Sequence, residues 1–428
     1  MDFSVKTGDA DKQRSQCVVV GVFSPRRLSP AAERLDKASR GQLTELLKQG
    51  DIATDCGSTT LVHQPRGRVQ AERILVVGCG KAKDFDARAY NKAAAAAARA
   101  VDTGAATEAL SYLPELDVEG HSLAWKCRQV ILASHDAAYR FDELKSDAKP
   151  PKKPLRRLAI GVSDKADAAE ARQGVKQGRA VAAGVERARR LGNLPGNICT
   201  PAYLADQARD IKATSARLKV KVLDEKDMQK LGMGALLSVA RGSRQPAKLI
   251  SLEYSGGERG DKPVVLVGKG VTFDSGGISL KPGAAMDEMK FDMCGAASVL
   301  GTLAAAAELE LPLNLVGIVP ATENLPDGDA SKPGDIVTSM SGQTIEILNT
   351  DAEGRLILCD ALTYAERFDP EVVVDIATLT GACIVALGHH MTGLLANDQE
   401  LADELLAAGR NASDPAWQLP MGEEYDEQ

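Results

Sequence analysis

Ionisable residues and glycines gather in segment 267–282, which reads Val-Gly-Lys-Gly-Val-Thr-Phe-Asp-Ser-Gly-Gly-Ile-Ser-Leu-Lys-Pro. It holds three chargeable side chains, those of Lys269, Asp274 and Lys281, and Asp292 follows ten residues after it ends. Its four glycines would let the backbone approach a bound ligand closely. A structural interpretation is a turn in which Asp274 only accepts hydrogen bonds from its own backbone. The glycine spacing fits neither common nucleotide-binding pattern, so we expect no phosphate loop here.

A second cluster lies in the segment Asn349-Thr-Asp-Ala-Glu-Gly-Arg-Leu356. Thr350 and Glu353 have the spacing of a capping box, which would only begin a helix over the apolar residues that follow. A capping box requires neither Asp351 between its two members nor Arg355 after them. Two acids and an arginine grouped in this way favour a site for a metal ion and an anion.

Four acids are available for metal binding: Asp274, Asp292, Asp351 and Glu353. Hard divalent cations prefer carboxylate oxygens, and carboxylates that bridge two ions hold them close enough to share one water molecule. Lys269 could also be a ligand, because desolvation and a neighbouring dication both lower the pKa of an amine. The five histidines include no H-E-x-x-H motif, so the sequence predicts a carboxylate-rich site.

The elements that must position these residues alternate between strands and helices. Helical stretches such as Ala296 to Leu309 lie between apolar strands predicted at Leu218 to Leu223, Leu249 to Tyr254, Val264 to Val267, Leu313 to Val319 and Val372 to Ile376. This order predicts a large α/β domain with a mixed sheet. The two clusters follow the strands at 264–267 and 344–348, and ligands of α/β folds bind at the carboxyl ends of strands.

The first part of the chain predicts a smaller α/β domain over residues 1–164. Strands at Cys17 to Val22, Ile74 to Gly78 and Leu158 to Val162 alternate with helical stretches such as Tyr90 to Val101. The proline-rich residues 149–154 predict a loop before its last strand. Residues 165–192 predict a connecting helix that ends at helix-stop signals, and residues 193–428 form the larger domain.

Bulk composition excludes several classes of protein. A net charge of -7, 44% hydrophobic and 26% charged residues are typical of a globular protein without general attraction to nucleic acid. The N-terminus resembles no signal peptide, and no apolar run is long enough to span a membrane. Eight scattered cysteines contain no C-x-x-C pair, which fits a reducing compartment. We therefore predict a cytoplasmic protein.

The two clusters together resemble the signatures of the leucine aminopeptidase family, also called cytosol aminopeptidases, in its bacterial form. The octapeptide 349–356 matches the family's signature without a change, and 193–201 and 375–381 also match. This resemblance covers about residues 190–393 and identifies the larger domain as catalytic. Family members continue past residue 428 with further strands and helices, so the resemblance implies a catalytic domain that is incomplete at its C-terminus.

The resemblance implies a role for each site residue. Asp274 and Glu353 would bridge two divalent ions, Asp351 would complete one ion's ligands, and Lys269 with Asp292 would complete those of the more exchangeable ion. The family uses zinc, manganese, cobalt or magnesium, and manganese or zinc is expected here. Lys281 would be the electrophile that stabilises the oxyanion. Arg355 would hold a bicarbonate ion that acts as general base.

The implied reaction removes the N-terminal residue of a peptide with a free amine, and a metal-bridging water is the nucleophile. The family's side-chain pocket corresponds here to Met289, Thr378 and Gly381, consistent with leucine-like first residues. Met289 could otherwise simply fill the core, which is the commoner role of methionine. The resemblance also implies a homo-hexamer.

Two competing functions are weaker. A metal-dependent phosphoesterase also uses carboxylates and two ions, but such sites usually recruit histidines, and none lies near these clusters. An accessory DNA-binding role, known in some bacterial family members, would rest on the basic runs 152–157 and 187–190 alone. Such runs usually lie on solvated faces, so nucleic acid is not the expected partner.

Overall fold

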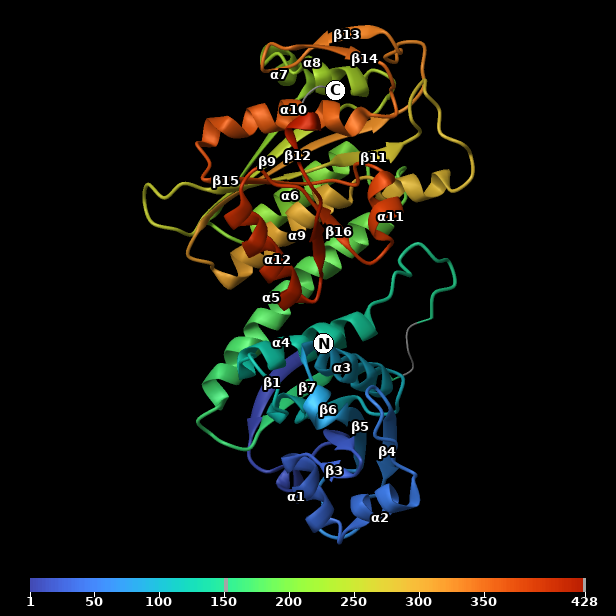
Figure 1. Cartoon of the computed structure of the whole chain (residues 1–428), viewed down its shortest axis with the longest axis vertical. Helices are drawn as coiled ribbons and strands as arrows, with labels where there is room; N and C mark the ends of the chain where they lie inside the picture. The colour runs from blue at the N-terminus through green and yellow to red at the C-terminus, as the bar shows by residue number, and fades with distance from the viewer. Residues whose placement is uncertain (150–152, 426–428) are drawn as a thin grey trace. The chain divides into compact units, whose positions relative to one another are not determined.

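The computed structural model describes residues 1–149 and 153–425 (Figure 1). Its first sheet places five parallel strands in the order β1-β7-β6-β2-β5, with β4 antiparallel at the edge and β3 antiparallel to β2. The strands are β1 (Asp2–Thr7), β2 (Val18–Ser24), β3 (Arg27–Leu28), β4 (Thr59–His63), β5 (Arg73–Lys81), β6 (Glu108–Ser111) and β7 (Arg157–Val162).

Apolar residues bury both faces of this sheet. In β2, Val18 and Val20 belong to one core cluster, while Val19 belongs to the cluster on the other face. Leucines of α1 (Pro30–Ala38) and α2 (Gln42–Gln49) join the first cluster, and residues of α3 (Ala87–Asp102) and α4 (Leu123–Ala138) join the second. The predicted smaller α/β domain is therefore confirmed as a fold, and the predicted loop at 149–154 lies partly outside the described residues.

The predicted connecting helix is α5 (Ala168–Asn193), and glycines set its packing. A Cβ atom at Gly178 would lie 2.7 Å from Ile131 Cβ of α4. Farther along, a Cβ at Gly184 would lie 2.6 Å from the carbonyl oxygen of Gly301 in α9 (Cys294–Leu309). One half of α5 thus packs closely on a helix of the first sheet, and the other half packs on a helix of the second.

The second sheet is mixed, as predicted. Its order is β15-β10-β12-β9-β8, in which β15, β10 and β12 are parallel and β9 is antiparallel to both of its neighbours, β12 and β8. In addition, β11 pairs in parallel with the end of β12. The bounds are β8 (Leu218–Asp224), β9 (Lys248–Ser255), β10 (Val264–Gly268), β11 (Gly270–Asp274), β12 (Asn314–Asn324) and β15 (Val372–Ile376). Two features were not predicted: β11 lies in the expected loop, and β12 runs five residues beyond Val319.

Helices cover both faces of this sheet (Figure 1). One buried cluster includes residues of α6 (Pro201–Ala213) and α9, and the other includes residues of α7 (Glu225–Lys230), α8 (Gly234–Ala240) and α10 (Glu353–Ala365). The predicted strand near residues 344–348 exists as β14 (Thr344–Ile347), but within the described residues its pairing partner is β13 (Asp335–Thr338), in a separate two-stranded sheet. The second acidic cluster therefore follows a hairpin rather than a strand of the central sheet.

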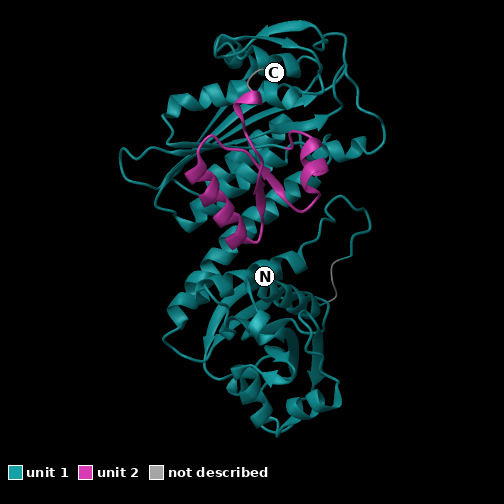
Figure 2. Ribbon diagram, viewed as in Figure 1, with its two compact units in different colours: residues 1–377 teal, residues 378–428 magenta. Residues whose placement is uncertain are grey.

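The chain divides into two compact units, residues 1–377 and 378–428 (Figure 2). The second unit contains α11 (Ala382–Leu387), β16 (Thr392–Leu394), α12 (Gln399–Ala412) and β17 (Ala416–Gln418). The domain boundaries at 164 and 192 stay predictions. Among the helices of the described residues, none combines the length and the apolar character needed to cross a membrane.

Candidate metal centre

One half of the site surrounds Lys269, which lies between β10 and β11. Its Nζ is 2.8 Å from both carboxylate oxygens of Asp292 and 2.8 Å from Glu353 Oε1. All three side chains are buried, with at most 7% exposed. Asp292 directly follows the short helix Met286–Phe291, whereas Glu353 is the first residue of α10. Two acids from distant segments therefore share one buried ammonium group.

The other half surrounds Lys281, whose Nζ lies 2.8 Å from Asp274 Oδ2 and 2.5 Å from Asp351 Oδ1. A tight turn at Gly276 and Gly277 brings this loop back toward Asp351. Both glycines have positive φ, +88° and +67°, and a Cβ at Gly276 would approach Asp351 Oδ1 to 3.0 Å. The glycines that the sequence singled out are therefore needed for the close approach of the two acidic loops.

The acids of the two halves form one cluster. Ligand oxygens of Asp274, Asp351 and Glu353 all lie within 4.8 Å of one another. Apart from their lysine contacts, Asp351 Oδ1 and Glu353 Oε1 accept no hydrogen bond from the described residues, although both atoms are buried. Four carboxylates thus face two ammonium groups, and hard divalent cations fit this set of oxygen ligands.

The neighbouring carboxylates favour the charged, ammonium form of both lysines. Burial by itself would lower the pKa of Lys269, but Asp292 and Glu353 outweigh it and raise that pKa above the usual value. Burial likewise opposes a rise at Lys281, yet Asp274 and Asp351 hold its pKa well above the ordinary range. Burial raises the pKa of Glu353, against the pull of Lys269. A cation that bound at Lys269 would have to displace its proton.

The structural interpretations of the two clusters have different outcomes. Asp274 Oδ1 does accept a hydrogen bond from Gly276 N at 2.9 Å, so the predicted turn exists, but its other oxygen faces Lys281. The interpretation of Thr350 and Glu353 as a capping box is wrong, because Ala352 occupies the N-cap position of α10 and Thr350 Oγ1 donates to Gly276 O instead.

No ion pair joins the remaining predicted residues to the acidic cluster in the described part of the chain. Arg355 is exposed on the first turn of α10, and Met289 is half-buried on the helix that leads to Asp292. Thr378 and Gly381 belong to the unit 378–428, so their role in a pocket stays a prediction.

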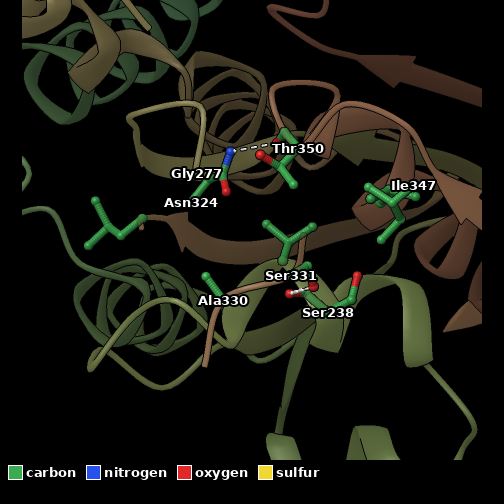
Figure 3. Close-up of a pocket in the computed structure, with 10 residues that line it drawn as sticks. Ser238, Gly277, Asn324, Ala330, Ser331, Ile347 and Thr350 are labelled. Carbon is green, nitrogen blue, oxygen red and sulfur yellow. Dashed lines mark hydrogen bonds between the residues drawn. The ribbon is translucent and has the colours of Figure 1, made fainter. Parts of the chain in front are cut away.

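Sequence reasoning missed Asn324, the last residue of β12. It lines a small cavity of about 10 Å³, enough for one water molecule, that also borders Gly277, Ile347 and Thr350 (Figure 3). Its side-chain amide donates to Asp274 Oδ1 at 2.8 Å. Nothing in the sequence pattern marked it, because an asparagine after an apolar run reads as the end of a strand.

Comparison with known proteins identifies the family. Residues 186–428 match the catalytic domain of the cytosol aminopeptidase family, and residues 19–148 match its N-terminal domain. The chain belongs to the cytosol aminopeptidase family. It is therefore an aminopeptidase, in a family of metal-dependent peptidases, and the resemblance found in the sequence is confirmed.

Relatives of this aminopeptidase match along its whole length. Probable cytosol aminopeptidases of Thioalkalivibrio sulfidiphilus and Alkalilimnicola ehrlichii are 58% and 57% identical over 428 residues, which are 100% of this chain and 86% of each relative. The solved structure of the bottromycin maturation enzyme BotP in complex with Mn is similar, with a TM-score of 0.81 and 35% identity. That match covers 96% of this chain and 83% of the other.

The arginines of the basic run 187–190 bind acidic and polar side chains of the same chain. Arg187 donates to Gln207, Arg189 pairs with Asp136 at 2.7 Å, and Arg190 pairs with Glu143 at 2.7 Å. These partners neutralise two of the three arginines, which weakens the case for a nucleic-acid surface there. The other run, 152–157, begins with a residue outside the described part of the chain.

Proposed function

We propose that this aminopeptidase holds two divalent cations in the acidic cluster and hydrolyses the N-terminal residue of peptides. Asp274 and Glu353 would bridge the cations, Asp351 would complete one set of ligands, and Lys269 with Asp292 would complete the other. The observation that carries the proposal is the convergence of four largely buried acids against only two lysines. Burial of such an excess of negative charge is unfavourable unless cations offset it.

The chain's own residues have separate tasks in this proposal. When bound, the cations would activate a water nucleophile and polarise the peptide carbonyl. Lys269 must give up its proton to become a ligand, which its raised pKa opposes until a dication arrives. Lys281 keeps its charge and would stabilise the negative oxygen that develops from the carbonyl. Arg355, exposed on the first turn of α10, would hold an anion such as bicarbonate as general base.

Specificity and assembly extend the proposal. The substrates would be peptides with a free N-terminus and a leucine-like first residue, recognised by Met289, Thr378 and Gly381. Manganese or zinc is the proposed metal, and the manganese complex of the similar BotP structure supports manganese. Assembly as a homo-hexamer and a cytoplasmic location remain proposals; the family's name, cytosol aminopeptidase, supports the location.

Metal depletion and reconstitution test the two-metal mechanism. Prolonged chelation should abolish release of leucine from leucyl amide, and manganese or zinc should restore it in proportion to the metal bound, up to two ions per chain. Asp274→Asn should lower the affinity for both ions, because Asp274 would bridge them. Activity that persists in protein shown to be metal-free would contradict the mechanism, and saturation at one ion would leave only a one-metal version.

A further inference from the structure

Asn324 lies where the two acidic loops meet, at the end of β12. Its Nδ2 donates one hydrogen bond to Asp274 Oδ1 at 2.8 Å. It donates another to the carbonyl oxygen of Thr350 at 3.0 Å (Figure 3). The residue is only 4% exposed, so bulk solvent does not compete for these bonds. One amide group therefore touches an acid of the first loop and the backbone of the second.

The first bond orients the carboxylate of Asp274. Oδ1 receives two donors, Asn324 Nδ2 and Gly276 N, and the other oxygen faces Lys281. Two donors on one oxygen fix the plane of a carboxylate, as outer hydrogen bonds do for metal-ligating acids. Asp274 thus presents Oδ2 to the acidic cluster in a defined direction.

The second bond sets the position of the other loop. Thr350 directly precedes Asp351 and is bound on several sides: its Oγ1 donates to Gly276 O at 2.7 Å and accepts from Ser279 N at 2.8 Å. Asn324 contributes the bond to the Thr350 carbonyl, which is the only one of these that begins in the central sheet. Through it, β12 holds Asp351 and Glu353 at a fixed distance from Asp274.

We propose that Asn324 is a positioning residue of the metal centre. Its two hydrogen bonds fix the position of the loop that carries Asp274 relative to the loop that carries Asp351 and Glu353. The inference rests on the proposed two-metal function, and it adds a residue that is not among the proposed ligands or catalytic groups. Outer-shell partners of this kind typically change metal affinity by about 10- to 100-fold when they are removed.

A purely space-filling role for Asn324 makes the opposite prediction for two substitutions. Asn324→Leu keeps a branched side chain of similar shape but has no donor. Asn324→Ala also loses the donors, yet it enlarges the neighbouring cavity of about 10 Å³, and a water molecule there can donate to both oxygens. The positioning role therefore predicts weaker metal binding for the leucine variant, and the space-filling role predicts weaker binding for the alanine variant.

The test is calorimetric titration of Mn²⁺ into the chelator-treated protein of 428 residues. We expect Kd to rise about 10-fold in Asn324→Ala and about 100-fold in Asn324→Leu. Thr272→Val is the matched control, because Thr272 is fully buried and its Oγ1 bonds Thr322 O between the same strands without touching an acid. Its Kd should stay within about threefold of the wild-type value.

Three results would overturn the positioning role: an unchanged Kd in Asn324→Ala, a weaker Kd in Asn324→Ala than in Asn324→Leu, or an equal rise in Thr272→Val. If the leucine variant fails to fold, Asn324→Val takes its place, because valine also fills space at this position without offering a donor. Failure of the proposed function looks different, because the wild-type protein itself would then bind fewer than two Mn²⁺ ions.

Discussion

Removal of the buried ammonium group in Lys269→Met should destabilise the metal-free catalytic domain. Lys269 is 3% exposed and is the positive partner of Asp292 and Glu353, each at 2.8 Å. Methionine has a similar length without the charge, so the substitution leaves two buried carboxylates facing each other. Repulsion and desolvation then act together on the folded state.

The magnitude follows from the burial of these three groups. Breaking a buried ion pair by removing one partner typically costs about 3–5 kcal/mol. Because about 1.4 kcal/mol is a factor of ten, the opening equilibrium should rise roughly 100- to several thousand-fold. Protonation of Glu353 relieves part of the cost. Burial raises the pKa of Glu353 in the folded state above its unfolded value, so the variant should be least destabilised in acid, below the unfolded pKa, and should lose stability as pH rises.

Amide hydrogen exchange of β10 in the presence of a chelator measures this change, since the strand lies between β15 and β12 in the sheet and Lys269 follows it directly. Lys262→Met is the control: its pair with Asp369 is exposed, at 52% and 81%, and should contribute less than about 1 kcal/mol. Added Mn²⁺ should recover much of the lost protection. Wild-type exchange rates in chelated Lys269→Met at pH 8 would refute the reasoning, because the acids would then need no cation.

Three further predictions concern the site and the core. Lys281→Ala should lower kcat about 10²- to 10³-fold at saturating Mn²⁺, because the oxyanion loses a donor. The affinity for Mn²⁺ should hold or improve, because a positive charge leaves the site; loss of metal would instead show that Lys281 is a ligand. Asp360→Asn should destabilise the fold by about 1–3 kcal/mol in urea melts, because Asp360 accepts from Leu236 N and Met340 N and an amide leaves one donor unpaired. Cys79, Cys127 and Cys199 are at most 1% exposed and burial raises the pKa of each thiol, so iodoacetamide at pH 8 should label them only after the protein is unfolded in urea; labelling of the native protein at the rate of an exposed thiol would contradict this.

Periodic elements were predictable because one face or both faces of each must be apolar. The strand expected at Val264 to Val267 is β10, and the helix expected at Ala296 to Leu309 begins only two residues earlier, at Cys294. β11 could not be recognised in the same way. It contains glycine and threonine between two functional residues, and it forms only because the end of β12 offers a free edge to pair with.

The site was predictable in its ionisable residues but not in its supports. Charged groups that crowd glycines are visible in a sequence, whereas the partner of a hydrogen bond is fixed by distant contacts. Thr350 shows the difference: its spacing to Glu353 predicts a capping box, yet its hydroxyl donates to Gly276, 74 positions away in the chain. Asn324 is equally invisible, since its two acceptors lie 50 and 26 positions away.

The glycine contacts of α5 fix the angle about the helix axis between the face that packs on α4 and the face that packs on α9. Gly178 must face α4 while Gly184 faces α9, and each residue of an α-helix advances the side-chain direction by about 100°. A single residue inserted between them would turn one glycine away from its neighbour and place a side chain in the contact. Seven inserted residues restore the direction to within about 20° but lengthen the helix by about 10 Å. Length changes in homologous chains should therefore avoid residues 178–184 and collect in the loops on either side of α5.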